Sequence, residues 1–138
     1  NLQMIARAQD GLFSQVEVQR GLSVRRLVSN FTQEGSQWRI GERLRQMVQF
    51  QQFNLLESPA SLGRFDVVFC RNVLMYFDQV TRVSVLANIA KVLAPDGSLL
   101  IGTAESIAGL NTGYVQTEHA PGLYHRPRSL PPLLRRAS

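Results

Sequence analysis

Polar residues that come at or directly after apolar runs are the first candidates for chemistry in this sequence. Asn54 lies in one such run, Arg71 and Asn72 come directly after the run 65–70, and Tyr76 follows four residues after Asn72. An asparagine amide can both donate and accept hydrogen bonds, as a purine edge can, and Arg71 and Asn72 add fixed donors. These side chains would suit a purine-bearing ligand. Polar residues at strand ends can equally serve only to satisfy free backbone groups.

Tyr76, taken alone, also fits an amphipathic residue at the edge of the core with its hydroxyl in water. The sequence does not contain the residue patterns of a metal site, a phosphate-binding loop or a nucleophile elbow. His119 and His125 have no carboxylate or cysteine at ligand spacing, so we expect no metal site. A glycine-rich phosphate loop and a nucleophile elbow are absent from the sequence as well.

Composition is typical of a folded protein of modest size. The 138 residues fit one domain or part of one, and 44% hydrophobic residues are enough for a core. No apolar run reaches the ~18 residues that cross a bilayer, and the start carries no signal-peptide pattern. The single cysteine, Cys70, allows no internal disulfide, so we expect a reducing, cytoplasmic setting without membrane insertion.

The net charge of +5 raises the question of nucleic-acid binding. Several arginines lie in the terminal segment "RPRSLPPLLRRAS", and the others are scattered without interleaved aromatic residues. Scattered surface charge is ordinary, and we therefore expect no nucleic-acid partner.

The first half of the chain predicts two helices and a small sheet. Apolar residues at helical spacing stop at Gly11, which predicts a helix over the first ten residues. A second helix is expected over 23–31, with Ser23 as its N-cap. Short strands are expected at 38–40 and 47–50 around a turn at 41–45, because apolar and glutamine residues alternate in the latter run.

The second half predicts a parallel sheet. The nearly continuous apolar run 65–70 is typical of a strand covered on both faces. A helix capped by Asp78 follows and stops at 95–97, and a second covered strand is expected over 98–103. Segments 114–118 and 122–126 then favour a closing antiparallel hairpin.

Together these elements predict an α/β fold, in which a strand–helix–strand crossover builds a parallel sheet with an antiparallel edge hairpin. Ligands of open α/β sheets bind beyond the carboxyl ends of the strands. In this sequence we expect those ends at 54–55, 71–72 and 103–106, where polar residues gather.

The segment "FDVVFCRNVLMYFD", followed by a helix and "LAPDGSLLIGTAES", resembles the C-terminal half of the catalytic domain of the CheR family of chemotaxis-receptor methyltransferases. The segments "ARAQDGLFSQVEVQRGL", "FNLLE" and "PGLYHR" occur in the family's order, and the resemblance covers residues 1–126. It implies a Rossmann-like class I methyltransferase fold with a small antiparallel β subdomain at about 32–50. Residues 127–138, rich in Pro, Ser and Arg, are expected to form a disordered tail.

The resemblance implies methylation of glutamate side chains on the cytoplasmic helices of chemotaxis receptors, as part of sensory adaptation. The methyl donor would be S-adenosyl-L-methionine, with S-adenosylhomocysteine as product. By position, Asn54 and Leu55 resemble the pair that lines the adenine site, and Arg71 and Asn72 resemble the pair that borders the cofactor. Tyr76 resembles the tyrosine near the methionine end of the cofactor and the reacting carboxylate, and so would be catalytic.

The chain also departs from the family pattern. The glycine-containing first loop, the acidic residue that holds the ribose and the N-terminal helical domain do not occur in it. We therefore expect a fragment, or the C-terminal part of a longer protein, that alone holds little cofactor and is inactive. The connection "TQEGSQWRIGERL" is shorter than in members that capture a receptor's C-terminal pentapeptide by adding a strand, so we expect no such docking.

Other functions are compatible with parts of this pattern. A non-catalytic regulatory or scaffold domain with the same fold is the main alternative. A nicotinamide-binding domain would need a glycine fingerprint after its first strand, which the sequence lacks. A phosphoacceptor receiver domain is disfavoured because Asp66 lies inside its strand rather than at the carboxyl end.

Overall fold

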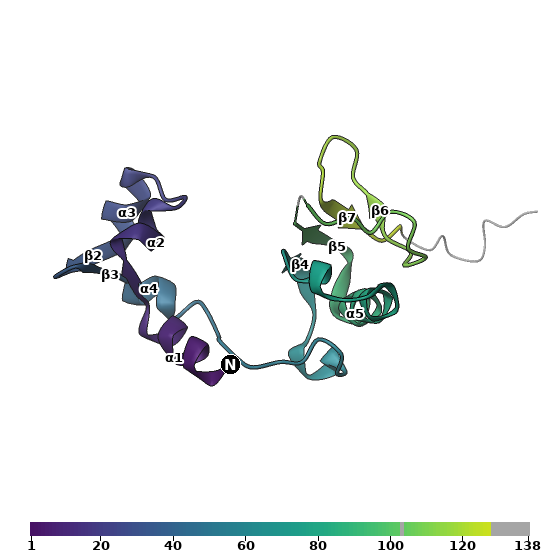
Figure 1. Cartoon of the computed structure of the whole chain (residues 1–138), viewed down its shortest axis with the longest axis horizontal. Helices are drawn as coiled ribbons and strands as arrows, with labels where there is room; N and C mark the ends of the chain where they lie inside the picture. The colour runs from purple at the N-terminus through teal and green to yellow at the C-terminus, as the bar shows by residue number, and fades with distance from the viewer. Residues whose placement is uncertain (103, 128–138) are drawn as a thin grey trace, which may run out of the picture. The chain divides into compact units, whose positions relative to one another are not determined.

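The computed structural model forms two compact units, Asn1–Phe53 and Asn54–Ser138, and describes residues 1–102 and 104–127 (Figure 1). Each unit has its own sheet, in the order β1-β3-β2 in the first and β4-β5-β7-β6 in the second. None of the helices in the described part of the chain is long and apolar enough to cross a membrane. Thr103 and most of the expected tail, residues 128–138, lie outside the described residues.

The first unit combines a small antiparallel sheet with short helices. Its elements are α1 (Leu2–Asp10), β1 (Leu12–Ser14), α2 (Gln15–Gln19), α3 (Val24–Asn30), β2 (Phe31–Glu34), β3 (Gln37–Ile40) and α4 (Glu42–Arg45). The predicted first helix is confirmed, and it ends at Gly11 in the left-handed conformation, with φ of 66°. The second predicted helix is confirmed too, and the side chain of Ser23 accepts a hydrogen bond from the Arg26 N–H as its cap.

The hairpin of this unit differs from the prediction. The strand expected at 38–40 is confirmed, but its neighbour is β2, and the two pair antiparallel around a turn at Gly35, which has φ of 59°. The strand predicted at 47–50 is wrong, because these residues are exposed and form no strand, and 42–45 is a helical turn. Phe31, the last residue of the predicted helix, pairs instead with Ile40 and begins β2.

The second unit contains the predicted crossover. Its elements are η1 (Pro59–Leu62), β4 (Phe65–Cys70), η2 (Leu74–Tyr76), α5 (Gln79–Val92), β5 (Leu93–Ile101), β6 (Val115–Gln116) and β7 (Leu123–His125). β4 and β5 pair in parallel with α5 between them in sequence, as predicted. β6 and β7 pair antiparallel, which confirms the closing hairpin, and β7 joins the sheet beside β5. The result is an α/β unit with a mixed parallel and antiparallel sheet.

The hydrophobic core of the described part of this unit lies between α5 and the sheet. Val85, Leu86 and Ile89 of α5 pack with Leu99 and Ile101 of β5 in one cluster of buried side chains. Leu86 and Leu99 are 0% exposed, so the helix is fixed firmly against the strand. This packing sets where the carboxyl ends of β4 and β5 lie.

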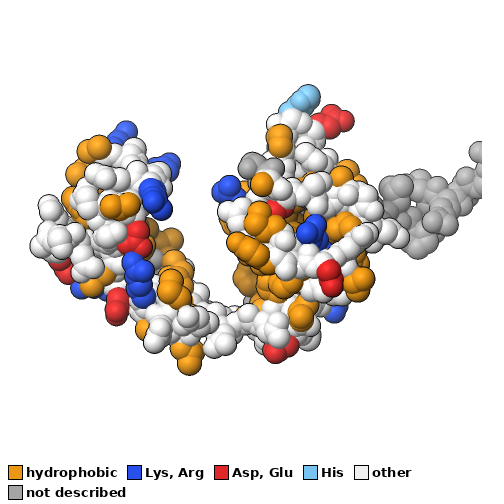
Figure 2. Space-filling view, in the orientation of Figure 1, with side chains coloured by type: hydrophobic (Ala, Val, Ile, Leu, Met, Phe, Trp, Pro, Cys, Tyr) orange, Lys and Arg blue, Asp and Glu red, His pale blue; other side chains and the backbone are white. Residues whose placement is uncertain are grey.

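Two expectations about the parallel strands need correction. β5 begins at Leu93, directly after α5, and runs through the predicted stop at 95–97 with a shift in its register against β4. β4 was expected to be covered on both faces, but Phe65, Val67 and Phe69 on one face are 40%, 50% and 70% exposed. Figure 2 shows hydrophobic side chains at the surface of this unit.

Candidate functional site

The loop after β4 brings three of the predicted site residues together. Arg71 and Asn72 leave the strand, Asn72 in the left-handed conformation with φ of 58°, and Tyr76 ends the short helix η2. Leu74, only 1% exposed, anchors η2 in the core, whereas Tyr76 is 80% exposed and presents its ring to solvent. Buried and exposed side chains on one turn of helix thus fix the backbone and leave the tyrosine accessible.

Glu105 holds this loop from outside it. Its Oε2 accepts hydrogen bonds from the Asn72 N–H at 2.7 Å and from the Gly102 N–H at 2.8 Å. Its Oε1 accepts one from the Met75 N–H at 3.1 Å. Asn72 follows the end of β4 and Gly102 follows the end of β5, so one carboxylate oxygen joins the carboxyl ends of two neighbouring parallel strands.

The electrostatics of Glu105 agree with this geometry. Burial raises the pKa of this half-buried carboxyl, but the backbone N–H groups of Asn72, Gly102 and Met75 lower it by more, and the pKa lies below its usual value. The negative form is the one that accepts all three hydrogen bonds. Glu105 is therefore a carboxylate at neutral pH.

Sequence reasoning did not select Glu105 as a site residue. It marked 103–106 as a polar strand end, and that position beyond the neighbouring parallel strand was the available signal. What it could not show is that a side chain 33 residues beyond Asn72 folds back onto its backbone.

Gly102 is required by the close approach of these groups. A Cβ at Gly102 would lie 2.5 Å from Asn72 Oδ1 and 2.6 Å from Glu105 Oε2. Both distances are shorter than any ordinary carbon–oxygen contact, so only glycine fits without displacing the loop or the carboxylate.

Asn54 lies in a turn rather than at a strand end. Its Oδ1 accepts from the Leu56 N–H at 3.1 Å, and its Nδ2 donates to Glu57 Oε1 at 3.3 Å. Such local bonds are typical of asparagine in turns. The side chain is exposed, so these contacts could be exchanged for contacts to a ligand.

The turn at 54–57 is tied to the same core as the loop after β4. Asn88 of α5 donates from Nδ2 to the carbonyl oxygens of Leu55 at 3.0 Å and Glu57 at 3.1 Å. Leu55 and Val73 both pack against the cluster formed by α5 and β5. The two predicted ligand segments are thus each fixed to the second unit by a side chain from another element.

Cys70 at the end of β4 does not supply a nucleophile. It is 6% exposed, and burial, followed by the charge of Glu105, raises the pKa of its thiol to about 11. At neutral pH the thiol is protonated and inert. In the described residues no group of three potential ligands could hold a metal ion.

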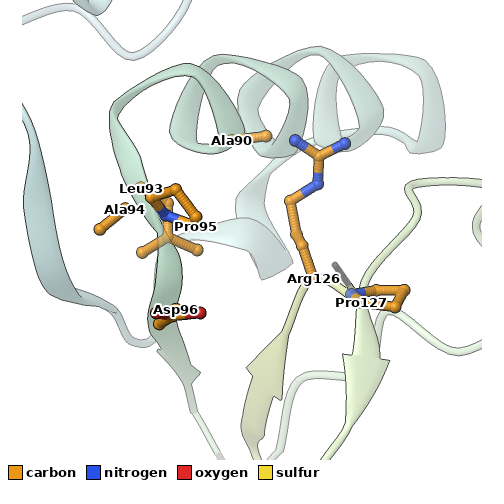
Figure 3. Close-up of a pocket in the computed structure, with 7 residues that line it drawn as sticks. All are labelled: Ala90, Leu93, Ala94, Pro95, Asp96, Arg126 and Pro127. Atoms are coloured by element: carbon orange, nitrogen blue, oxygen red, sulfur yellow. The ribbon is translucent and has the colours of Figure 1, made fainter. Parts of the chain in front are cut away.

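A cleft of about 420 Å³ lies elsewhere on this unit (Figure 3). It is lined by Ala90, Leu93, Ala94, Pro95, Asp96, Arg126 and Pro127. Leu93 to Asp96 form the beginning of β5, whereas Asn72 follows the end of its parallel neighbour β4. The cleft therefore lies at the amino ends of the parallel strands and the loop at their carboxyl ends. The cleft contains none of the predicted site residues.

A parallel strand pair with its crossover helix, carrying polar side chains beyond the carboxyl ends, is the arrangement of an α/β domain, in which ligands bind beyond those ends. Comparison with known families makes the class specific. Residues 1–122 match the family described as CheR methyltransferase, SAM binding domain, and the chain belongs to this family.

Individual relatives agree with this assignment. The chain is 38% identical over 124 residues to the chemotaxis protein methyltransferase Cher2 of Pseudomonas putida and to chemotaxis protein methyltransferase 1 of Pseudomonas aeruginosa. Each alignment covers 89% of the chain and 45% of the relative. A chemotaxis protein methyltransferase of Salmonella typhimurium is 40% identical over 73 residues, which is 52% of the chain and 25% of the relative. The chain thus spans less than half the length of these curated relatives.

Proposed function

We propose that the natural protein containing this chain is an S-adenosylmethionine-dependent methyltransferase that forms γ-methyl esters on glutamate side chains of chemotaxis receptors. The family match over residues 1–122 and the names of the relatives support this proposal. The single structural observation that carries it is the exposed Tyr76 on the same loop as Arg71 and Asn72, at the carboxyl edge of the sheet.

The donor set fits part of such a cofactor. The amide of Asn54 and the apolar side chain of Leu55 suit an adenine ring, whose edge has donors and acceptors and whose faces are apolar. Arg71 and Asn72 would border the rest of the nucleoside and the amino-acid end. A Cβ at Gly102 would lie 2.5 Å from Asn72 Oδ1, so the glycine allows the Asn72 side chain to lie between the two strand ends.

S-adenosylmethionine, when bound, supplies a methyl group on a positively charged sulfur. The protein has little acid–base work to do, since a glutamate with a pKa of about 4.3 is already anionic at neutral pH. Its task is to align the carboxylate oxygen and exclude water, and positioning of this kind can contribute ~7–11 kcal/mol. In this proposal the hydroxyl of Tyr76 orients the reacting carboxylate and takes no proton.

Tyr76 suits that role because its hydroxyl is a modest hydrogen-bond donor. Opposite charges on the two reactants cancel during the transfer, so a group that held the carboxylate too strongly would stabilise the ground state and slow the reaction. An arginine at this position would have that defect, whereas a phenol would not.

The partners in this proposal are receptor helices on the cytoplasmic side of the membrane. Each ester removes one negative charge from a helix, which changes the repulsion between neighbouring helices and so can shift a signalling equilibrium. We propose further that the protein does not need to capture a receptor's C-terminal pentapeptide.

The test is transfer of labelled methyl groups from S-adenosylmethionine to receptor cytoplasmic fragments by the natural protein. We expect base-labile methyl esters, and we expect Tyr76→Phe to lower turnover about tenfold or more while cofactor affinity stays within severalfold, as for one lost orienting hydrogen bond. Cofactor binding without any methyl transfer would support the scaffold alternative. Unchanged turnover in Tyr76→Phe would contradict the role given to the tyrosine.

A further inference from the structure

Glu105 occupies an unusual place between two strand ends. The ladder between β4 and β5 pairs Cys70 with Ile101. The N–H groups of Asn72, two residues beyond Cys70, and of Gly102, one residue beyond Ile101, both donate to Glu105 Oε2. In addition, the Glu105 N–H donates to the Gly102 carbonyl at 3.0 Å. The side chain therefore continues the ladder beyond its last backbone pair.

The same carboxylate also reaches the helix that carries Tyr76. Its other oxygen accepts from Met75, the residue directly before Tyr76. The Tyr76 N–H bonds within the turn, to the Val73 carbonyl at 3.2 Å, so the backbone of 72–76 has defined partners at most of its positions. Arg71 and Tyr76 remain exposed at either end of this fixed segment.

We infer that Glu105 is a positioning residue of the proposed cofactor site, which holds the backbone of 72–75 so that Asn72 and Tyr76 are presented in the geometry that binding requires. The identity of the ligand in this inference rests on the proposed function. The contact that positions the loop is the set of hydrogen bonds that Glu105 accepts in the structure. A loop ordered before the ligand arrives does not have to be ordered at the expense of binding energy. Loss of Glu105 would therefore weaken cofactor binding through the backbone that it holds, without any direct contact of Glu105 with the ligand being required.

The chemistry of the contact requires a carboxylate rather than any polar group of that size. All its described partners are N–H donors, and a carboxylate offers acceptor sites on both oxygens. A glutamine has the same shape but one oxygen, and its NH₂ would face a backbone N–H whichever way it turned. Glu105→Gln thus replaces one carboxylate oxygen, which accepts a hydrogen bond, by an NH₂ group that faces a backbone N–H and cannot accept one.

The experiment uses the natural protein and measures two quantities at a temperature where every variant is folded. These are hydrogen exchange of the amides of Asn72, Met75 and Gly102, and the Kd for S-adenosylhomocysteine. For Glu105→Gln we expect lost amide protection and a Kd raised about tenfold or more, the size of one lost charge-assisted hydrogen bond. Glu105→Asp keeps the charge on a shorter stem and should recover part of the affinity.

Two control variants separate positioning from general damage. Glu118→Gln makes the same chemical change at an exposed carboxylate of this unit and should leave the Kd within about twofold. Val92→Ala removes two methyl groups from a buried residue of α5 that lies outside the cluster holding Leu74, which lowers stability, and should also leave the Kd unchanged.

The outcomes distinguish this inference from the proposed function. Wild-type protein that binds S-adenosylhomocysteine with a Kd unaffected by Glu105→Gln would contradict the inference alone. Lost amide protection with unchanged affinity would contradict it too, since the loop would then be ordered by the ligand without cost. Wild-type protein that binds no S-adenosylhomocysteine would overturn the proposed function, and the positioning role would fall with it.

Discussion

Each of the two units is stabilised internally by a different kind of contact. The second unit has a cluster of buried side chains between α5 and the sheet, whereas Val18 is the only buried large hydrophobic residue within 1–53, a range that the structure describes completely. In the first unit polar side chains add several long-range contacts to the pairing of the strands. Trp38 Nε1 donates to Gln15 Oε1 at 2.6 Å, which ties β3 to α2.

Arginines do much of this work in the first unit. Arg39 donates to the Asp10 carbonyl at 2.8 Å and to Glu34 Oε1 at 2.6 Å, so one guanidinium links the end of α1 to the hairpin. Arg45 donates to the Gln9 carbonyl at 2.9 Å. Both arginines satisfy carbonyl groups that the last turn of a helix leaves free. The comparison teaches that a unit with little buried area can be ordered by side chains that complete its helix ends.

The largest expected effect separates the two kinds of stabilisation. Leu99→Ala removes a side chain that is 0% exposed in the second unit and should lower that unit's free energy of unfolding by about 2–5 kcal/mol. The single tryptophan, Trp38, reports on the first unit by fluorescence, and amide exchange reports on the second. If the Trp38 fluorescence and the amide exchange reported equal losses in the free energy of unfolding, the two units would not be stabilised separately.

Gly11→Ala should act on the first unit in the same selective way. Gly11 has φ of 66°, and an added Cβ would lie 2.8 Å from Ile40 Cγ2. The left-handed conformation alone costs about 1–2 kcal/mol for a residue with a side chain, and the contact adds to this. We expect the Trp38 fluorescence midpoint in urea to fall while exchange in α5 stays unchanged. Gly35, which lies in the same unit and has φ of 59° but nothing within 4 Å, provides the control Gly35→Ala without the contact.

Acid should weaken both units through different carboxylates. In the second unit, burial raises the pKa of Glu105 but backbone N–H groups lower it further, and the result lies below its usual value. In the first unit, hydrogen bonds from Ser14 and the charge of Arg7 lower the pKa of Glu17. A carboxylate with a lowered pKa stabilises the folded state fully above its unfolded pKa of about 4.3, and this contribution is lost as pH falls through the folded value.

The measurement is the stability of each unit between pH 7 and pH 3. Glu105→Gln should flatten the dependence in the second unit below about pH 4.3 and leave that of the first unit as it is. An identical slope in wild type and variant would show that Glu105 does not change its pKa on folding.

The smallest expected effect is that of Arg7→Ala. Its side chain bonds Glu17 Oε1 at 2.7 Å, but both side chains are largely exposed, 55% and 40%. Exposed ion pairs contribute little because water and salt screen them. We expect a shift of the Trp38 fluorescence midpoint well below that of Gly11→Ala, and none at 1 M salt. A large shift at high salt would mean that Arg7 acts through packing rather than charge.

The sequence predicted the second unit better than the first, and the reason is physical. An apolar run of six residues, a capped helix and a further apolar run define β4, α5 and the end of β5 with little competition from other patterns. In the first unit, apolar and polar residues alternate at 47–50 as they would in a strand. In the structure, however, β3 pairs with β1 and β2, and no local pattern in the sequence favours this pairing over one with 47–50. Tertiary pairing decides such cases.

The candidate site was predicted in part for a similar reason. Arg71, Asn72 and Tyr76 are neighbours in sequence, so their common loop could be predicted, and their roles remain predictions. Glu105 and Asn88 act on backbone groups about thirty residues away, and such contacts have no signature in residue type or spacing. The side chains that could face a ligand were therefore predictable, while those that hold them in place were not.

The uncovered face of β4 has a consequence for handling the protein. Among the described strands β4 lies at the edge of its sheet, paired with β5 on one side only, and it presents Phe65, Val67 and Phe69 to water. An apolar edge strand of this kind is a template on which further chains can add, which leads to aggregation. The 138-residue chain should therefore precipitate as its concentration rises, and Val67→Lys should delay precipitation by placing a charge on that strand.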